Sequence, residues 1–134
     1  MDLLEVREYA LTLPEVEESM PFGDDVLAFK VAGKIFLLLW LGGSPERIAL
    51  KCDPDRAIEL RDRHPEIVPA WHLNKRHWND IYLNGDLPSA QIRHEVLHAW
   101  EMTVRSNVSP KALRIRLLSQ LPSKDRSETT TDAE

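Results

Sequence analysis

The sequence predicts a single α+β domain in which helices from both ends of the chain pack on an antiparallel sheet. Segments with helical and with strand periodicity follow one another in the order helix, strands, helix, strands, helix. Turn signals, and not helices, separate the strands within each group, whereas a doubly wound parallel sheet needs a crossover helix between successive strands. The chain of 134 residues, 43% of them hydrophobic, is long enough to bury one core.

The first part of the chain is predicted to hold one helix and three strands. Apolar residues at helical spacing over residues 3–13 end before Pro14, which indicates an amphipathic helix. The acidic stretch that follows, up to residue 25, is expected to be a loop. Two apolar runs then flank Ala32-Gly33-Lys34, which is typical of a hairpin with Lys34 at its tip. In "RIALKC", residues 47–52, apolar residues alternate with Arg, Ala and Lys, which predicts a strand with one solvent face.

The second part is predicted to contain three helices and two strands. Asp53-Pro54 supplies an N-cap and a first-turn proline for a helix that ends near His64. The stretch "PAWHLNKRHWND" and its continuation "DIYLNGDLP" are expected to form two strands with a tight turn near Asn74-Lys75. The longest helix should cover residues 88–106, and a short one should run from Pro110 to about Leu121. We therefore expect one domain over residues 1–121 and a disordered acidic tail over residues 122–134.

The core should be built from apolar residues on the inner faces of these elements. Burial of such residues from water is the main favourable contribution to folding. The residues expected in the core are Phe29, Ile35, Leu37, Leu39, Leu50, Ile58, Val96 and Trp100.

Charge and cysteine content restrict the class of protein. The net charge is −5, but it is uneven: residues 1–25 have a balance of −7, and residues 26–122 have fourteen Lys and Arg against ten Asp and Glu, a balance of +4. The longest apolar run, residues 35–41, is far too short to span a bilayer. Cys52 has no second cysteine with which to form an internal disulfide. We expect a cytoplasmic, monomeric protein with no membrane association.

One pattern, "HEVLH" at residues 94–98, matches the H-E-x-x-H form of zinc hydrolases. In those enzymes two histidines bind the metal and the glutamate is the general base. On a helix of 3.6 residues per turn, His94, His98, Glu101 and Arg105 form one stripe opposite Val96 and Trp100, and this stripe should face solvent. The sequence offers no third metal ligand at the spacing of the extended motif. We interpret the match as accidental and predict no catalytic residue, no metal site and no cofactor.

The stretch from residue 69 to residue 80 is the candidate binding site. Lys75 and Arg76 offer positive charge to phosphates, His72, Asn74 and His77 offer hydrogen bonds, and Trp71 and Trp78 offer rings on which bases of an opened or single strand stack. The alternative interpretation is structural. In that case, Trp71 and Leu73 enter the core, and the Asn and His side chains cap the turn.

This stretch also carries a family resemblance. Together with "PFG" at residues 21–23 and "FKVAGKIF" at residues 29–36, the segment at residues 50–88, with its H-x-N-K-x-H-W motif, resembles the MmcQ/YjbR family over residues 1–106. The resemblance implies a fold similar to that of CyaY/frataxin and DNA binding by a double-wing arrangement. The motif positions that it carries over to the site are His72, Asn74, Lys75, His77 and Trp78, with Arg76 between them. The first hairpin, with Lys34 at its tip, is our candidate for the second wing.

Three function classes follow from these observations. The first is a DNA-binding protein that binds weakly through basic hairpin tips, and the second is a protein-interaction or adaptor domain. The third is a zinc-dependent hydrolase that uses the HEVLH motif. A basic surface around Lys75 favours the first class, an exposed apolar patch favours the second, and three converging metal ligands favour the third.

Overall fold

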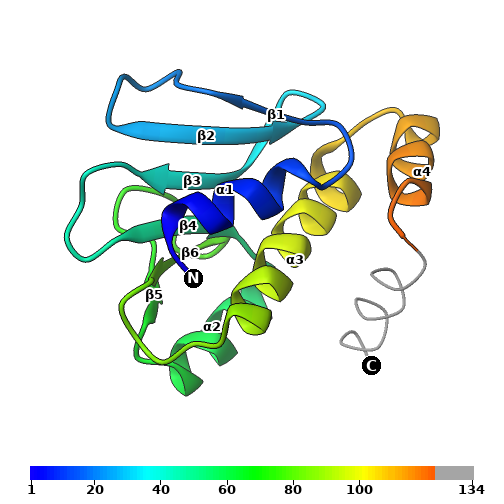
Figure 1. Ribbon diagram of the computed structural model, residues 1–134. Helices are drawn as coiled ribbons and strands as arrows, with labels where there is room; N and C mark the ends of the chain where they lie inside the picture. Colours follow the sequence, from blue (N-terminus) through cyan, green and yellow to red (C-terminus); the bar gives the residue numbers. More distant parts are fainter. Residues whose placement is uncertain (123–134) are drawn as a thin grey trace.

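The computed structural model describes residues 1–122 and has the predicted α+β architecture. Its sheet has six strands in the order β1-β2-β3-β4-β6-β5, and every neighbouring pair is antiparallel (Figure 1). Apart from Pro122, the predicted acidic tail lies outside the described residues. The elements, in chain order, are α1 (Leu3–Leu11), β1 (Val16–Ser19), β2 (Val26–Val31), β3 (Lys34–Trp40), β4 (Arg47–Lys51), α2 (Pro54–Arg63), β5 (Ile67–Pro69), β6 (Trp78–Tyr82), α3 (Ser89–Asn107) and α4 (Lys111–Ser119).

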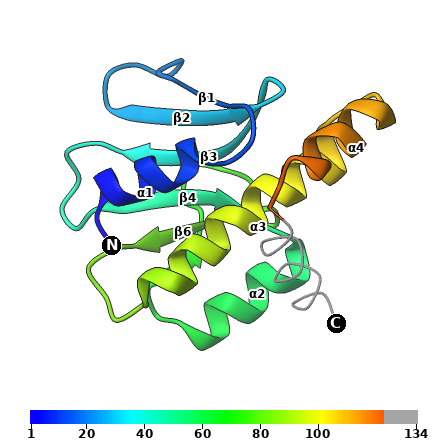
Figure 2. The ribbon, with the colours of Figure 1, turned by 45° about the vertical axis from the view of Figure 1, so that its right-hand side comes forward.

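Helices cover one face of the sheet. α1 and α3 lie across it, and α2 packs beside β5 and β6 on the same side (Figure 1, Figure 2). α4 contacts α3 and adds Leu117 to the core on this side. The prediction that helices from both ends of the chain pack with the sheet is confirmed. None of the helices in residues 1–122 is long and apolar enough to cross a membrane.

Strand β1 was missed by the sequence pattern. The stretch that was expected to be a loop contains the four-residue strand "VEES", which pairs with β2 at the edge of the sheet. Because an edge strand is held by backbone hydrogen bonds and has a solvated side, it needs no apolar alternation. The carboxylate of Glu18 also accepts hydrogen bonds from Arg7 of α1, at 2.6 and 2.8 Å.

The β2–β3 hairpin follows directly from local sequence. Ala32 and Gly33 both have positive φ angles, 49° and 76°, and a two-residue turn of this kind matches the twist of the flanking strands. Further along β3, Phe36 is an extra residue, because Phe29 pairs with Leu37 and Lys30 pairs with Ile35. This bulge turns both Phe36 and Leu37 toward the helices, where both are fully buried.

Six of the eight predicted core residues are buried, and two are not. Ile35 is half-buried on the face of the sheet away from the helices, and Ile58 is 56% exposed, so its assignment to the core was wrong. α2 instead buries Ala57 and Leu60, which lie three residues apart on the inner face of the helix. The confirmed core residues are Phe29, Leu37, Leu39, Leu50, Val96 and Trp100.

The second face of the sheet is also partly covered. Val26, Ala28, Leu38 and Ala49 are buried there in a separate, smaller apolar cluster. The prediction of a solvent face for the strand at residues 47–52 was therefore wrong at Ala49, which is fully buried. The partly buried side chains that pack against this cluster are Ile35, Trp40, Leu73 and Trp78.

Candidate functional site

Residues 70–77, which we call the 70–77 loop, connect β5 to β6 and do not extend the two strands as predicted. The predicted turn at Asn74 is present, since its side-chain Oδ1 accepts the Arg76 N–H at 2.9 Å and its carbonyl accepts the His77 N–H at 3.1 Å. The His77 carbonyl in turn accepts the Cys52 N–H at 2.8 Å. These bonds fix both ends of the turn.

The loop folds back over the second face of the sheet. The Trp71 N–H donates to Oδ2 of Asp80 at 3.4 Å, Leu73 packs against the small apolar cluster, and the His72 ring lies 5.7 Å from that of Trp40. The Trp71 side chain itself is 72% exposed. The structural alternative, in which both Trp71 and Leu73 enter the core, therefore holds for Leu73 only in part and is wrong for Trp71.

Three tryptophans on this side of the molecule each have a cation beside the ring. The Arg47 guanidinium lies 4.5 Å from the Trp40 centroid, and Lys51 and Lys75 lie 6.0 and 5.6 Å from the rings of Trp78 and Trp71. All the cation–π contacts found within residues 1–122 are in this set. We call it the basic-aromatic face; its members are Trp40, Arg47, Lys51, Trp71, Lys75 and Trp78.

Asp80 connects the basic-aromatic face to the 70–77 loop through hydrogen bonds. It is almost fully buried, and its Oδ2 receives both the Trp71 N–H and, at 3.3 Å, the Arg47 guanidinium. Burial raises the pKa of Asp80, while the Trp71 N–H and the Arg47 charge lower it. One carboxylate thus orients both the loop that carries Trp71 and the arginine that lies over Trp40.

The structure brings together most of the predicted site residues. His72, Asn74, Lys75 and Arg76 are exposed on the loop, and His77 and Trp78 are half-buried at its end. Lys34 is at the separate β2–β3 turn. Its partner in the sheet is Val31, which is buried on the helix side, so Lys34 does not belong to the basic-aromatic face.

Sequence reasoning missed Trp40, Arg47 and Lys51 as members of this face. Alternation along β4 places Arg47 and Lys51 on one side of the strand, and this signal was present in the sequence. No signal in the sequence indicated that these two residues lie beside tryptophans, because this depends on the pairing of β4 with β3 and β6. In that pairing Arg47 lies opposite Trp40, and Lys51 lies opposite Trp78.

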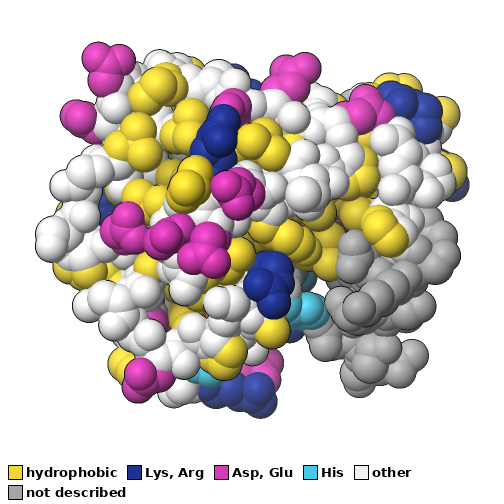
Figure 3. Space-filling view, in the orientation of Figure 1, with side chains coloured by type: hydrophobic (Ala, Val, Ile, Leu, Met, Phe, Trp, Pro, Cys, Tyr) yellow, Lys and Arg dark blue, Asp and Glu magenta, His cyan; other side chains and the backbone are white. Residues whose placement is uncertain are grey.

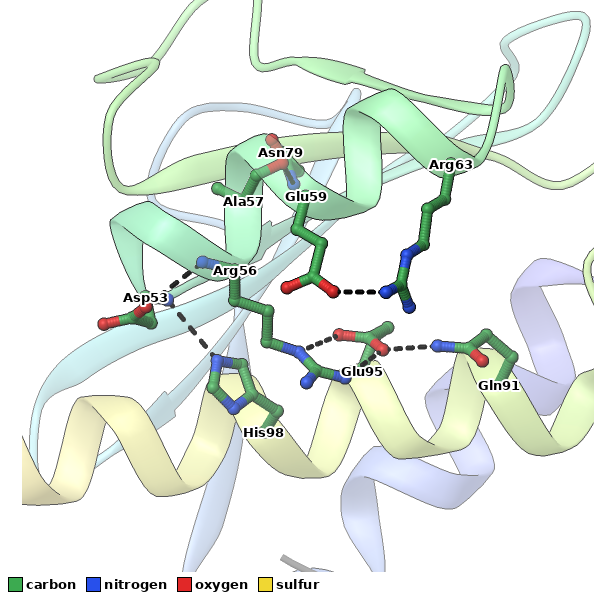
Figure 4. Close-up of polar contacts among 9 residues, drawn as sticks. All are labelled: Asp53, Arg56, Ala57, Glu59, Arg63, Asn79, Gln91, Glu95 and His98. Atoms are coloured by element: carbon green, nitrogen blue, oxygen red, sulfur yellow. Dashed lines mark hydrogen bonds and ion pairs between the residues drawn. The ribbon is translucent and has the colours of Figure 1, made fainter. Parts of the chain in front are cut away.

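The HEVLH motif is part of α3, and its Glu95 and His98 side chains point toward α2 (Figure 4). Glu95 is buried, and its two oxygens accept hydrogen bonds from the Arg56 guanidinium at 3.1 and 2.7 Å and from Gln91 at 2.6 Å. This carboxylate is engaged in a structural ion pair, and a general base needs a carboxylate free to take a proton. Among residues 1–122, no three His, Cys, Asp or Glu side chains are grouped so as to hold a metal ion.

The predicted solvent exposure of this helical stripe was wrong for three of its four residues. Glu101 is buried, and His98 is half-buried, with its Nε2 accepting the Asp53 N–H at 3.4 Å (Figure 4). His94 is half-buried as well, and of the four residues only Arg105 is exposed. The physical reason is that α3 is covered on two sides, by the sheet on one and in part by α2 and its N-cap on the other.

Cys52 has no nucleophilic role that the structure supports. Burial raises the pKa of its thiol to about 12, so the thiol is protonated at neutral pH.

Because His98 accepts a hydrogen bond in a partly buried position, stability should depend on pH. Burial lowers the pKa of His98, and the charges of Arg56 and His94 lower it further, while Glu95 and Asp53 raise it. At a pH between the folded pKa and about 6.5, the unfolded chain binds more protons at this residue than the folded chain. At pH values above that range, the residue is neutral in both states.

We therefore expect the free energy of unfolding to fall as the pH drops below about 6.5, with His98 contributing at most about 1.4 kcal/mol per pH unit. Urea unfolding at pH 7.5 and pH 5.5 measures this change. In His98→Gln the fall between the two pH values should be smaller than in the unaltered protein. An equal fall in both proteins would assign the pH dependence to other groups.

Comparison with known proteins gives a consistent set of relatives. A model of the YjbR family matches residues 11–102. YjbR of Escherichia coli K12 is 32% identical over 121 residues, 90% of this chain and 100% of the relative. YbdF of Escherichia coli O157:H7 is 35% identical over 111 residues, 82% of this chain and 90% of the relative. Both relatives are described as uncharacterised.

Solved structures agree with this set. A Deinococcus radiodurans protein with a DUF419 domain aligns with a TM-score of 0.81 at 32% identity, covering 90% of this chain and 89% of that one. A Pseudomonas syringae protein aligns with a TM-score of 0.67 at 26% identity, covering 77% and 99%. The family match spans the whole sheet, the 70–77 loop and most of α3.

Proposed function

The chain belongs to the YjbR family, and from that premise we propose that it binds nucleic acid through the basic-aromatic face and the 70–77 loop, with single strands preferred over duplex. The observation that carries the proposal is Trp71, which is 72% exposed and has the Lys75 ammonium 5.6 Å from its ring. A large aromatic side chain in water beside a cation is typical of surfaces on which unpaired bases stack.

The chemistry of the loop suits a single strand. The ring of Trp71 offers a stacking surface, Lys75 and Arg76 offer charge to phosphates, and His72 and Asn74 offer hydrogen-bonding groups. In a duplex the bases are stacked on one another and have no free face for the tryptophan. This difference is the basis for the expected preference.

The loop is also arranged before any ligand arrives. The Asp80 carboxylate holds the Trp71 backbone, and the Asn74 side chain holds that of Arg76. A binding loop that is already ordered loses less conformational entropy when it binds, so more of the contact energy contributes to affinity.

The overall charge works against tight binding. The net charge is −5, and residues 1–25 alone contribute −7. The positive charge is local, since Arg47, Lys51, Lys75 and Arg76 are on or next to the basic-aromatic face. We expect weak binding that depends steeply on salt concentration.

Trp71→Ala should weaken the binding of a labelled oligothymidylate about fivefold or more, because stacking one base on an aromatic side chain contributes about 1–3 kcal/mol. Lys75→Ala/Arg76→Ala should also weaken binding. This double variant should reduce the slope of log affinity against log salt by about 0.7 for each phosphate that the protein no longer neutralises. Fluorescence anisotropy with single-stranded and duplex oligonucleotides at several salt concentrations measures both effects.

The matched control is Arg93→Ala/Lys111→Ala, which removes the same charge from exposed positions on α3 and α4. It should bind like the unaltered protein, and Lys34→Ala should lose less affinity than either loop variant. Since the altered loop side chains are exposed, the circular dichroism spectra should not change. If folded loop variants bind as well as the unaltered protein, or if no oligonucleotide binds, the proposal fails.

One observation favours a second candidate, a protein-interaction domain. Met20, Phe22 and Leu41 are 41%, 62% and 38% exposed. They lie at one end of the sheet, where the Leu41 N–H donates to the Asp25 carbonyl at 2.8 Å. Exposed apolar patches are common at protein interfaces. Under this alternative, the oligonucleotides stay unbound in the anisotropy assay with every variant.

A further inference from the structure

One end of the sheet, which we call the acidic end, has an excess of negative charge. Its loops, residues 20–25, 41–46, 64–66 and 83–88, contain five acids and no Lys or Arg. Within residues 1–122 none of these acids forms an ion pair, so their charge is not neutralised by the protein itself. Figure 3 shows acidic and hydrophobic side chains next to one another over the loop between β1 and β2. The acids are Asp24, Asp25, Glu46, Glu66 and Asp86.

Backbone hydrogen bonds join neighbouring loops of the acidic end into one surface. The Leu83 N–H donates to the Glu46 carbonyl at 2.9 Å. The Tyr82 N–H, at the end of β6, donates to the Glu66 carbonyl, also at 2.9 Å. The acids are therefore held beside one another across the sheet, and their fields add.

A wide groove of about 560 Å³ lies among three of these loops. Its lining is mainly apolar and includes the ring of Tyr82 with Pro45 and Pro65. The charged groups in the lining are the carboxylates of Glu66 and Asp86, and none of the described residues that line it is a Lys, Arg or His. An apolar groove with acids and no cation suits a ligand that combines apolar and positively charged groups.

The two carboxylates in the groove have different roles. That of Glu66 accepts the Asp86 N–H at 2.7 Å and packs so closely on Gly85 that a Cβ there would collide with it. Hydrogen bonding from its own N–H, and then from that of Asp86, lowers the pKa of Glu66, as does the nearby His64, so this group is ionised at neutral pH. Glu66 orders the wall of the groove. The exposed Asp86 carboxylate has no hydrogen bond or ion pair within residues 1–122 and is available to a ligand.

Tyr82 likewise has no cation beside its ring within the described part of the chain. Arg47 lies opposite it in the sheet, but the Arg47 guanidinium is engaged by Asp80 at 3.3 Å and lies 4.5 Å from the Trp40 centroid. The face of an aromatic ring and a carboxylate both attract a cation. The groove therefore offers both to a positively charged group from outside.

From this arrangement we infer that the acidic end binds a basic, extended segment of a partner protein. An Arg or Lys side chain of the segment lies over the Tyr82 ring and pairs with Asp86, and an apolar neighbour packs on Pro45. Charge complementarity selects this partner, because a nucleic acid would bring phosphates to unneutralised acids. The inference extends the second candidate function, on which it rests, to a groove and a partner of stated chemistry. It does not require nucleic-acid binding by the 70–77 loop.

Nuclear magnetic resonance titration of the ¹⁵N-labelled full chain tests the inference. The probe is a short synthetic peptide in which arginine alternates with leucine and proline, added at constant ionic strength. We expect saturable shifts at backbone amides of residues 41–46, 64–66 and 82–87, with a dissociation constant on the order of 1 mM. Asp86→Asn should weaken binding about threefold, as expected for an exposed ion pair. Asp86→Asn/Tyr82→Leu should weaken it about tenfold, because the cation–π contact is lost as well.

Three controls separate the groove from other effects. Asp62→Asn makes the same change at an exposed position on α2 and should bind like the unaltered protein. Lys75→Ala/Arg76→Ala should retain peptide binding even if it has lost oligonucleotide binding, so failure of either proposal is recognised separately. A peptide with glutamate in place of arginine should not bind.

The single variant Asp86→Asn, at an exposed side chain, provides a folded protein if the double variant unfolds. Unmoved groove amides, unchanged affinity in Asp86→Asn, or equal binding of the glutamate peptide would overturn the inference. Shifts of the groove amides that depend on protein concentration without any peptide would assign the acidic end to a second copy of the chain, and would overturn it too.

Discussion

Trp100→Ala should lower the free energy of unfolding by about 3–5 kcal/mol, because it removes a large side chain from the interior and leaves a cavity. Trp100 is fully buried in the core between α3 and the sheet. Its indole Nε1–H donates to the Pro14 carbonyl at 3.1 Å, which connects α3 to the segment that leads from α1 into β1. The substitution therefore removes both packing and a connection between distant parts of the chain.

Urea unfolding followed by circular dichroism measures this loss, and two variants support its interpretation. Trp100→Phe keeps most of the apolar volume but leaves the Pro14 carbonyl without its donor, so it should cost less than the alanine variant. Ile58→Ala truncates an apolar side chain that is 56% exposed, and its midpoint should hardly move. Similar losses in Ile58→Ala and Trp100→Ala would mean that the inner faces of α2 and α3 are assigned wrongly.

Arg56→Ala should also destabilise the fold, by about 3–5 kcal/mol, because it leaves a buried carboxylate without its counter-charge. The Glu95 side chain is 3% exposed, and that of Arg56 is 23% exposed. With the guanidinium gone, Glu95 keeps the hydrogen bond from the Gln91 amide, which is a neutral donor. A single hydrogen bond of this kind does not compensate the cost of removing a carboxylate from water.

Arg63→Ala shows how much of this loss is due to burial of the ion pair. It removes the arginine of the Arg63–Glu59 pair, whose N–O distance of 2.6 Å is close to the 2.7 Å of the Arg56–Glu95 pair. Because the Glu59 and Arg63 side chains are 56% and 68% exposed, this variant should lose only about 0–1 kcal/mol. Adding Glu95→Gln to Arg56→Ala should recover part of the stability, since it removes the unpaired charge. Equal losses in Arg56→Ala and Arg63→Ala, measured by urea unfolding, would contradict the view that Glu95 is held as a buried ion.

Local patterns predicted the elements whose determinants lie within a few residues of one another. The helix of residues 3–11 begins at Asp2, whose side chain accepts the Glu5 N–H, and α2 begins at Asp53 with a proline in its first turn. The β2–β3 turn was visible as Ala32-Gly33. A cap or a two-residue turn is formed by neighbours in the chain, so its signal is present in the sequence itself.

Long-range packing explains the predictions that failed. β1 forms because β2 offers an open edge, although "VEES" has no strand alternation of its own. Ala49 is buried in a cluster against which Trp40, Leu73 and Trp78 pack, and Glu101 and His98 are less exposed than predicted because α3 has neighbours on two sides. In each case the deciding partner is distant in the sequence and cannot be identified from local periodicity.

By itself, the sequence determined the α+β class, most of the secondary structure, six of the eight core residues that we predicted and the segment in which the candidate site lies. These features depend on apolar spacing, caps and turns, which are local properties. The tertiary structure alone decided that Trp71 stays in water, that Arg47 and Lys51 lie beside tryptophans, and that Glu95 is a buried partner of Arg56. Strand register and helix packing bring these residues together from separate parts of the chain, and both are set by the free energy of the whole fold.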